Sequence, residues 1–120
     1  LQVSLPVFHQ QAVVERDFSY PFVVRMMSTN PAESFGLENK GTLEPGTDAD
    51  IIVFDPASQT EIDSADNESI SDHSIYEGME VNGTVTKTFV RGALVAEDGT
   101  VTGSPGHGDF VERGVPNWDT

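Results

Sequence analysis

The sequence DADIIVFDPA, residues 48–57 of 120, marks the point where the chain changes from helical to β pattern. Its centre, Asp50–Phe54, is a short apolar run of the kind that forms a strand buried on both faces. Asp55 and Pro56 follow as a turn signal and are predicted to end that strand. Thr60–Ile62 is predicted to form a further short strand.

The segment after this strand alternates between loop and β signals. Residues 63–77 are polar and acidic, and they are predicted to form a loop. Glu80–Val81 and Thr84–Arg91 are rich in Val and Thr, which favour strands. Arg91-Gly92 is predicted to form a kink or turn after them.

A hairpin signal follows the turn. Ala93–Ala96 and Thr100–Thr102 are predicted strands, and the Asp98-Gly99 dipeptide between them is a strong hairpin signal. After Gly103 the sequence is rich in Gly and Pro and ends near Trp118 without periodicity. A tail of this composition is expected to be loose unless something docks it.

The first third of the chain carries three helix start signals, each a capping residue followed by a proline. They are Ser4 with Pro6, Ser19 with Pro21, and Asn30 with Pro31. Glu33 lies where a capping box with Asn30 would place it, so Asn30-Pro31-Ala32 is assigned a structural role and not a functional one. Arg16 and Asp17 are predicted to end the first helix, and Gly36 the third.

One apolar stripe and the order of the elements give the fold class. Phe22, Val23, Met26 and Met27 recur at helical spacing and are expected to be core residues rather than cofactor contacts. Helical signals precede β signals without alternating with them. This order predicts an α+β fold and not a repeating βαβ sheet.

The charge balance excludes several partners. The chain has 20 acidic and 6 basic residues, a net charge of −14. Nucleic-acid binding needs Lys and Arg to displace counterions from phosphates, so neither nucleic acid nor an anionic membrane is an expected partner. The acidic residues are scattered between apolar runs, which indicates a solvated face on a folded domain. Salt screens such a charge excess, and a halophilic source is therefore the hypothesis.

Composition also bears on compartment and completeness. There is no Cys, which excludes disulfides and thiol chemistry and is compatible with a cytoplasmic location. Leu1–Pro6 has no basic or apolar signal-peptide region. The sequence begins without Met inside an apolar pattern, which predicts a fragment or a processed chain.

Several motifs, taken together and in order, resemble the cyclic amidohydrolases. Ser28–Ala32 followed by Phe35–Leu37 resembles the segment that closes their barrel. Lys40–Asp50 and Ile52–Pro56 resemble the re-entry into their small β-sandwich. The later motifs resemble the dihydropyrimidinase, hydantoinase and allantoinase group. These motifs are Tyr76–Val81, Gly83, Val90–Gly92, Asp98-Gly99 and Gly103–Gly108.

This resemblance implies a fold and an activity. The fold would be a metal-bearing (β/α)8 barrel with a β-sandwich built from both chain ends. Residues 1–38 would be the terminal helical segment of the barrel, 39–103 a β-sandwich segment, and 104–120 a Gly/Pro-rich tail. The activity would be hydrolysis of a non-peptide C–N bond in a cyclic amide or ureide, such as a hydantoin or dihydropyrimidine.

The residues that carry this chemistry in the family are not matched here. The family uses a His-x-His pair, a carboxylated Lys, two further His and an Asp to hold two divalent ions, zinc being the metal expected. This chain has only His9, His73 and His107, widely separated, and only Lys40 and Lys87. No catalytic, substrate-binding or metal-binding residue is therefore assigned, and the chain alone is predicted to be inactive.

Other candidate motifs have structural or chance explanations. His107 lies between two glycines and is expected to face solvent or a neighbouring subunit. The Asp72-His73 pair could act as an oriented base, but no Ser or Cys nucleophile motif accompanies it, so it is not assigned a catalytic role. The spacing of Asp48, Asp50 and Asp55 suggests a calcium-binding loop. This loop is excluded because Ile52 occupies the next ligand position and no Gly follows. The glycosylation sequons at Asn67 and Asn82 are interpreted as chance.

Two alternatives remain open at this point. Within the superfamily, allantoinase and dihydroorotase are close to hydantoinase, and no motif here separates them. A non-catalytic scaffold acting by self-assembly is the alternative of a different class. The resemblance also implies a homo-oligomer, with the remainder of the parent chain as partner.

Overall fold

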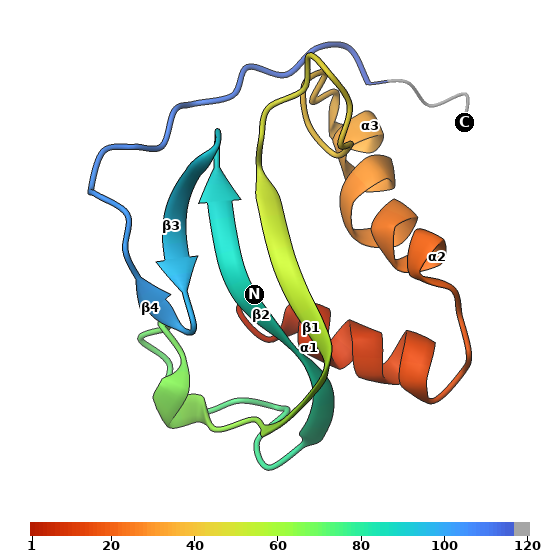
Figure 1. Ribbon diagram of the computed structural model, residues 1–120, viewed down its shortest axis with the longest axis vertical. Coiled ribbons are helices and arrows are strands. Elements are labelled where there is room, and N and C mark those ends of the chain that lie inside the picture. Colours follow the sequence, from red (N-terminus) through yellow and green to blue (C-terminus); the bar gives the residue numbers. More distant parts are fainter. Residues whose placement is uncertain (117–120) are drawn as a thin grey trace.

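The computed structural model describes residues 1–116, which form one antiparallel sheet with helices on one of its faces (Figure 1). The sheet has the order β1-β2-β3-β4. Its strands are β1 Ile51–Glu61, β2 Glu80–Val90, β3 Ala93–Glu97 and β4 Thr100–Val101. Helices precede strands along the chain, so the α+β class is confirmed.

Two helical rods, not three, cover the sheet. Helix α1, Ser4–His9, continues through a π-helical turn, Gln10–Val14, and the rod ends before Asp17, whose φ is +55°. Helix α2, Tyr20–Val24, continues through a second π-helical turn, Arg25–Thr29, directly into α3, Asn30–Phe35.

The predicted cap at Asn30 is wrong because the chain is already helical there. Asn30 has φ −61° and ψ −43°, and its amide lies 3.9 Å from Met26 Sδ instead of capping a backbone N–H. In a regular α-helix a proline ring clashes with the carbonyl four residues earlier, and the wider π turn before Pro31 is one way to accommodate the ring. The helix therefore passes through the Asn-Pro signal without a break.

The other two caps differ from the prediction in detail. The helix α1 begins after Val3, so Ser4 lies inside it. Ser19 does occupy the position before α2, but its side chain makes no cap hydrogen bond. Its carbonyl oxygen instead accepts from the N–H of Phe22 at 3.0 Å.

The predicted stop at Gly36 is confirmed. Gly36 has φ +68°, and its N–H donates to Glu33 O while the N–H of Leu37 donates to Ala32 O. This paired pattern is the Schellman motif, which favours glycine because the left-handed conformation is strained for residues with a Cβ atom.

Strand β1 does not end at Asp55-Pro56, as was predicted. It runs on to Glu61 with register irregularities between Val53 and Phe54 and between Asp55 and Gln59. Proline is tolerated here because β1 lies at the edge of the sheet and is bulged. Ile52 is 48% exposed, so the prediction of a strand buried on both faces is also wrong for this chain.

The remaining β elements follow the predicted turns. Strand β2 is continuous through Asn82 and Gly83, where two strands were predicted. Both residues of each tight turn, Arg91-Gly92 and Asp98-Gly99, have positive φ. This backbone is that of type I′ hairpins, which match the right-handed twist of the strands. The loop 63–77 is confirmed except for a short 3-10 turn, Ser64–Asp66.

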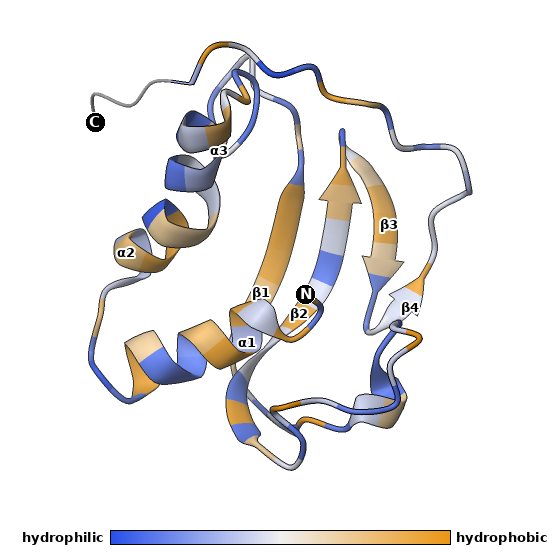
Figure 2. Cartoon of the chain, turned by 180° about the vertical axis from the view of Figure 1, so that it is seen from behind, coloured by the Kyte–Doolittle hydropathy of each residue, from blue (hydrophilic) through white to orange (hydrophobic). Residues whose placement is uncertain are grey.

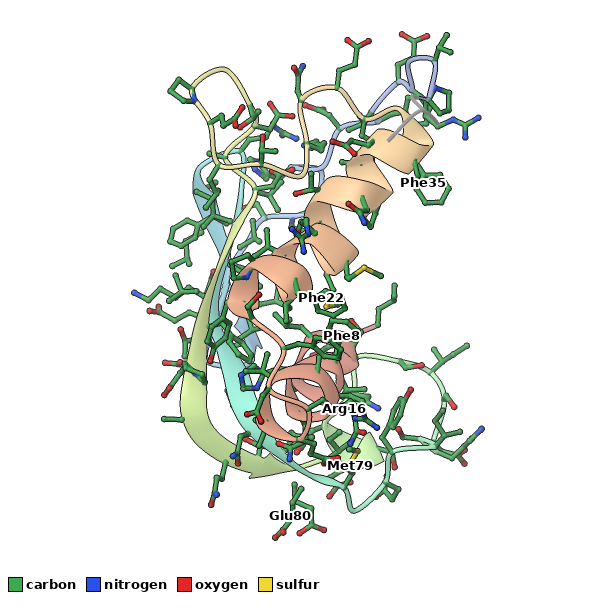
Figure 3. All side chains as sticks on the ribbon, turned by 90° about the vertical axis from the view of Figure 1, so that its right-hand side faces the viewer. Phe8, Arg16, Phe22, Phe35, Met79 and Glu80 are labelled. Atoms are coloured by element: carbon green, nitrogen blue, oxygen red, sulfur yellow. The ribbon has the colours of Figure 1, made fainter. Side chains whose placement is uncertain are left out.

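The core between the layers is small. Its buried apolar members are Ala12, Val23, Ala32, Ile62 and Val81. The predicted stripe is only partly buried, because Met26 is 46% exposed. Phe8 and Phe22 lie together on the helical side (Figure 3), with their ring centroids 6.3 Å apart.

Much apolar surface therefore remains open. Figure 2 shows the first part of β1, which begins with Ile51–Phe54, as a hydrophobic ribbon. The register places Ile52, Thr88, Ala96 and Val101 in one row across the sheet. A groove of about 860 Å³ lies along this row and beside the start of α1. No helix within residues 1–116 is long and apolar enough to cross a membrane.

Candidate functional site

The most buried polar group of the described chain is the imidazole of His9, at the junction of helix and sheet. His9 is 2% exposed. Its Nδ1 lies 2.5 Å from the carbonyl oxygen of Asn82 in β2, and its Nε2 lies 3.3 Å from the hydroxyl of Tyr20 at the start of α2. One ring on the first helical rod thus contacts both the second rod and the sheet.

Aromatic packing and a glycine make room for this ring. His9 stacks against Tyr20 with ring centroids 5.8 Å apart and meets Phe54 edge to face at 4.9 Å. A Cβ atom on Gly83 would lie 2.2 Å from Phe54 Cζ and 3.0 Å from His9 Nδ1. Gly83 also has φ +121°, so both space and backbone favour glycine at this position.

The hydrogen bonds assign His9 a structural role. A carbonyl oxygen only accepts, so the Nδ1–H of His9 must donate to Asn82. The Nε2 atom of His9 then faces the Tyr20 hydroxyl, so neither ring nitrogen is open to a metal ion or substrate. Sequence analysis did not find this role. The one available signal was Gly83, which lies between two predicted strands and in the structure lies inside β2, where a glycine can mark a close approach of another part of the chain.

The other two histidines lie in different surroundings. His73 is on the loop 63–77, and its exposed ring lies 3.3 Å from Asp72 Oδ1. His107 is in the C-terminal tail, and its Nε2 donates to the carbonyl oxygen of Val90 at 2.9 Å. That ring is partly covered by its own chain, so it does not simply face solvent, and its contact with a neighbouring subunit stays a prediction.

Both lysines form ion pairs, and Lys40 pairs with two of the three aspartates of the excluded calcium loop. Lys40 Nζ lies 2.8 Å from Asp48 Oδ2 and also binds Asp50 Oδ2. The hydrogen bonds to Asp48 and Asp50 raise the pKa of Lys40, and the bond from Lys40 lowers the pKa of Asp50. The second lysine, Lys87, pairs with Glu97 at 3.1 Å on the sheet.

The histidines, lysines and aspartates described above do not fit a divalent metal ion. Within residues 1–116 there is no group of three or more His, Cys, Asp or Glu side chains that could hold one. His9 uses both ring nitrogens, His107 binds a backbone carbonyl, and Lys40 is neutralised by its aspartates. The described part of the chain therefore offers a helix–sheet joint and a charge cluster, not a metal centre.

Comparison with known proteins identifies the family. A family model described as "Amidohydrolase family" matches residues 3–95. The L-hydantoinase of Paenarthrobacter aurescens is 38% identical over 94% of this chain and 25% of that protein. An allantoinase of Salmonella newport is 33% identical over 92% of this chain and 24% of that protein.

Solved structures give the same result. The crystal structure of dihydropyrimidinase from Brevibacillus agri NCHU1002 matches with a TM-score of 0.89 and 32% identity, over 94% of this chain and 25% of that one. The L-hydantoinase structure from Arthrobacter aurescens matches with a TM-score of 0.87 and 38% identity, over 92% and 25%. The chain spans about a quarter of the length of these relatives, and it belongs to the amidohydrolase family.

Proposed function

We propose that this chain is the C-terminal portion of a metal-dependent hydrolase that opens cyclic amides or ureides at a C–N bond. The observation that carries the proposal is the match to L-hydantoinase, which extends over 94% of the chain at 38% identity and agrees with a TM-score of 0.87 to a structure of that type. Similarity of this extent supports a shared fold and a shared reaction class.

The contribution of the chain to such an enzyme would be structural. Residues 1–38 would complete the barrel wall, 39–103 would supply strands of a β-sandwich, and 104–120 would form a tail. The open sheet row and the groove support this arrangement, since apolar surface of this kind marks an interface. The metal, expected to be zinc, and the catalytic groups would be held by residues outside this chain.

Hydantoins and dihydropyrimidines are the proposed substrates. Several hydantoinases are 35–38% identical to this chain. Allantoinase is the second candidate, because the Salmonella newport protein is 33% identical over nearly the whole chain. Dihydroorotase belongs to the same superfamily and is the third.

The test is an assay of the complete protein that contains this chain. It would be loaded with Zn²⁺ and offered hydantoin, dihydrouracil, allantoin and dihydroorotate, with a chelator-treated sample as control. Turnover of hydantoin or dihydrouracil that is lost on chelation is expected. Turnover of allantoin alone would replace the first substrate class by the second. No turnover of any of them would contradict the proposal and favour a non-catalytic scaffold.

Further proposals concern the setting of the enzyme. The 20 acidic and 6 basic residues support a salt-adapted protein working in a salt-rich cytoplasm. The open apolar surface supports association with the rest of the parent chain and into a homo-oligomer. A rise in melting temperature from dilute buffer to molar KCl is expected, and a flat response would contradict salt adaptation.

A further inference from the structure

Up to residue 116, the chain after β4 adds no further strand to the sheet. It crosses from the outer strand to the end of α3, over one end of the sheet (Figure 1). We propose that residues 104–114 form a latched strap, held at the sheet by Arg91 and at the helix by Gly36, and that loss of the Arg91 latch frees the strap while the sheet stays folded. This inference is independent of the proposed reaction.

The first latch is built around the guanidinium of Arg91. Its Nη2 donates to the carbonyl oxygen of His107 and lies 3.3 Å from Asp109 Oδ2. The ring of His107 returns a hydrogen bond, because its Nε2 donates to Val90 O at 2.9 Å. Three polar contacts thus hold residues 107–109 against the hairpin between β2 and β3.

The turn alone does not explain an arginine at this position. Arg91 has φ +47° and Gly92 has φ +79°, a type I′ turn for which Asn-Gly is the favoured pair. Arginine has no local advantage in the left-handed region. The guanidinium contacts with the tail are what an asparagine could not make. The side chain of Arg91 therefore serves the strap and not the turn.

The second latch is a contact between two glycine backbones. The N–H of Gly114 donates to the carbonyl oxygen of Gly36 at 2.7 Å. A Cβ atom on Gly36 would lie 2.5 Å from Gly114 O, and one on Gly114 would lie 2.8 Å from Glu38 Oε1. The strap can approach the end of α3 this closely because Gly36 lacks a side chain, since a Cβ atom there would meet backbone atoms. At Gly114 the Cβ atom would meet only the end of the flexible Glu38 side chain.

The segment between the latches is otherwise weakly held. Phe110 is 93% exposed, and Val111 and Glu112 are exposed as well. Segments with few buried apolar contacts open locally at low free-energy cost. The strap therefore depends on its latches, and one of these is a charged contact that a single substitution removes.

Hydrogen exchange of the full chain, followed by mass spectrometry, separates the strap from the turn. Arg91→Asn deletes the guanidinium but suits the type I′ turn. We expect the strap amides that donate backbone hydrogen bonds among the described residues, those of His107 and Gly114, to exchange about tenfold faster, as the loss of charged hydrogen bonds implies. Amides of the hairpin, residues 88–97, should exchange at the wild-type rate or more slowly.

Two further variants keep the test decisive if Arg91→Asn folds poorly. Asp109→Asn breaks the ion pair from the strap side, outside the sheet, and should also speed exchange in the strap. Glu112→Gln makes the same chemical change three residues away, at a side chain with no ion pair among the described residues, and should leave exchange unchanged.

The results that would overturn the latch are equally specific. If strap and hairpin amides sped up together in Arg91→Asn, Arg91 would serve the turn. If Asp109→Asn and Glu112→Gln behaved alike, the Arg91–Asp109 contact would hold nothing.

Discussion

The Nδ1–H of His9 donates to the carbonyl oxygen of Asn82, 2.5 Å away, and this bond joins α1 to β2 across 73 positions of sequence. The neighbouring residue completes the connection, because Gln10 Oε1 accepts from the Asn82 N–H at 2.9 Å. Both backbone hydrogen-bonding groups of Asn82 are thus bound by residues of the first helical rod. This pair of bonds fixes the position of the first helical rod relative to β2.

The first prediction concerns His9→Ala. The change removes the ring between Tyr20 and Phe54 and leaves the Asn82 carbonyl without its donor. A cavity and an unsatisfied buried acceptor together should lower the free energy of unfolding by about 3 kcal/mol, measured by urea denaturation. His73→Ala, at an exposed histidine, is the control and should change it by less than about 0.5 kcal/mol. Equal losses of unfolding free energy in the two variants would contradict the role of His9 as the joint between helix and sheet.

Gly83→Ala tests the close approach at the same joint. The new methyl group would collide with Phe54 and His9 on a backbone that already has φ +121°. The expected loss of unfolding free energy is about 3 kcal/mol or more. Gly108→Ala, where a Cβ atom meets nothing within 4 Å, is the control. A stable Gly83→Ala chain with unchanged near-ultraviolet circular dichroism would contradict the packing described.

Asn30→Ala tests the corrected view of the Asn-Pro signal. A capping residue would lose about 1 kcal/mol on this change. Because Asn30 lies inside a continuous helix, we expect a change below about 0.5 kcal/mol, since alanine has the higher helix propensity. Gly36→Ala is the contrasting variant, and its left-handed φ and the contact with Gly114 should make it clearly less stable. A large loss of unfolding free energy in Asn30→Ala would show that Asn30 acts as a helix cap.

A fourth prediction is the pH dependence of the Lys40–Asp50 contact. The hydrogen bond from Lys40 lowers the pKa of Asp50 below its ordinary value of 3.8, so its stabilising effect is present above that pH and is lost as pH falls through the lowered value. The bonds to Asp48 and Asp50 raise the pKa of Lys40 above 10.5, so that contribution is lost as pH rises through the raised value.

Asp50→Asn should therefore flatten the acidic end of the stability profile of the full chain, and the alkaline end only in part, because Asp48 still binds Lys40. Thermal unfolding across the pH range measures this, with Glu112→Gln as the control for loss of one acidic charge. A parallel acid limb in wild type and Asp50→Asn would show that the contact contributes no pH-dependent stability.

Local signals in the sequence predicted the turns and the order of elements. The Asp98-Gly99 hairpin, the stop at Gly36 and the break near Asp17 each depend on a backbone conformation that the residues themselves favour, and the structure confirms all three. The α+β class followed from the segregation of helical and β patterns. Each of these features is decided within a few residues of the signal.

The predictions that failed involved competition between local signals and the surrounding structure. Asn30-Pro31 is a start signal that a π turn overrides, and Asp55-Pro56 is a stop signal that a bulged edge strand tolerates. The His9–Asn82 and Arg91–Asp109 contacts join distant segments, so no local pattern reports them. Residues 117–120, including Trp118, lie outside the described residues, and the prediction for that end of the tail stays a prediction.

The central proposal is that this chain is part of a cyclic-amide hydrolase whose catalytic groups are held by residues outside it. The most direct measurement is turnover by the purified 120-residue chain in high salt with Zn²⁺ or Mn²⁺, against hydantoin, dihydrouracil, allantoin and dihydroorotate. The account predicts no turnover of any of the four. Turnover that rises in proportion to chain concentration and disappears on chelation would contradict it, and would place a working metal site within these residues.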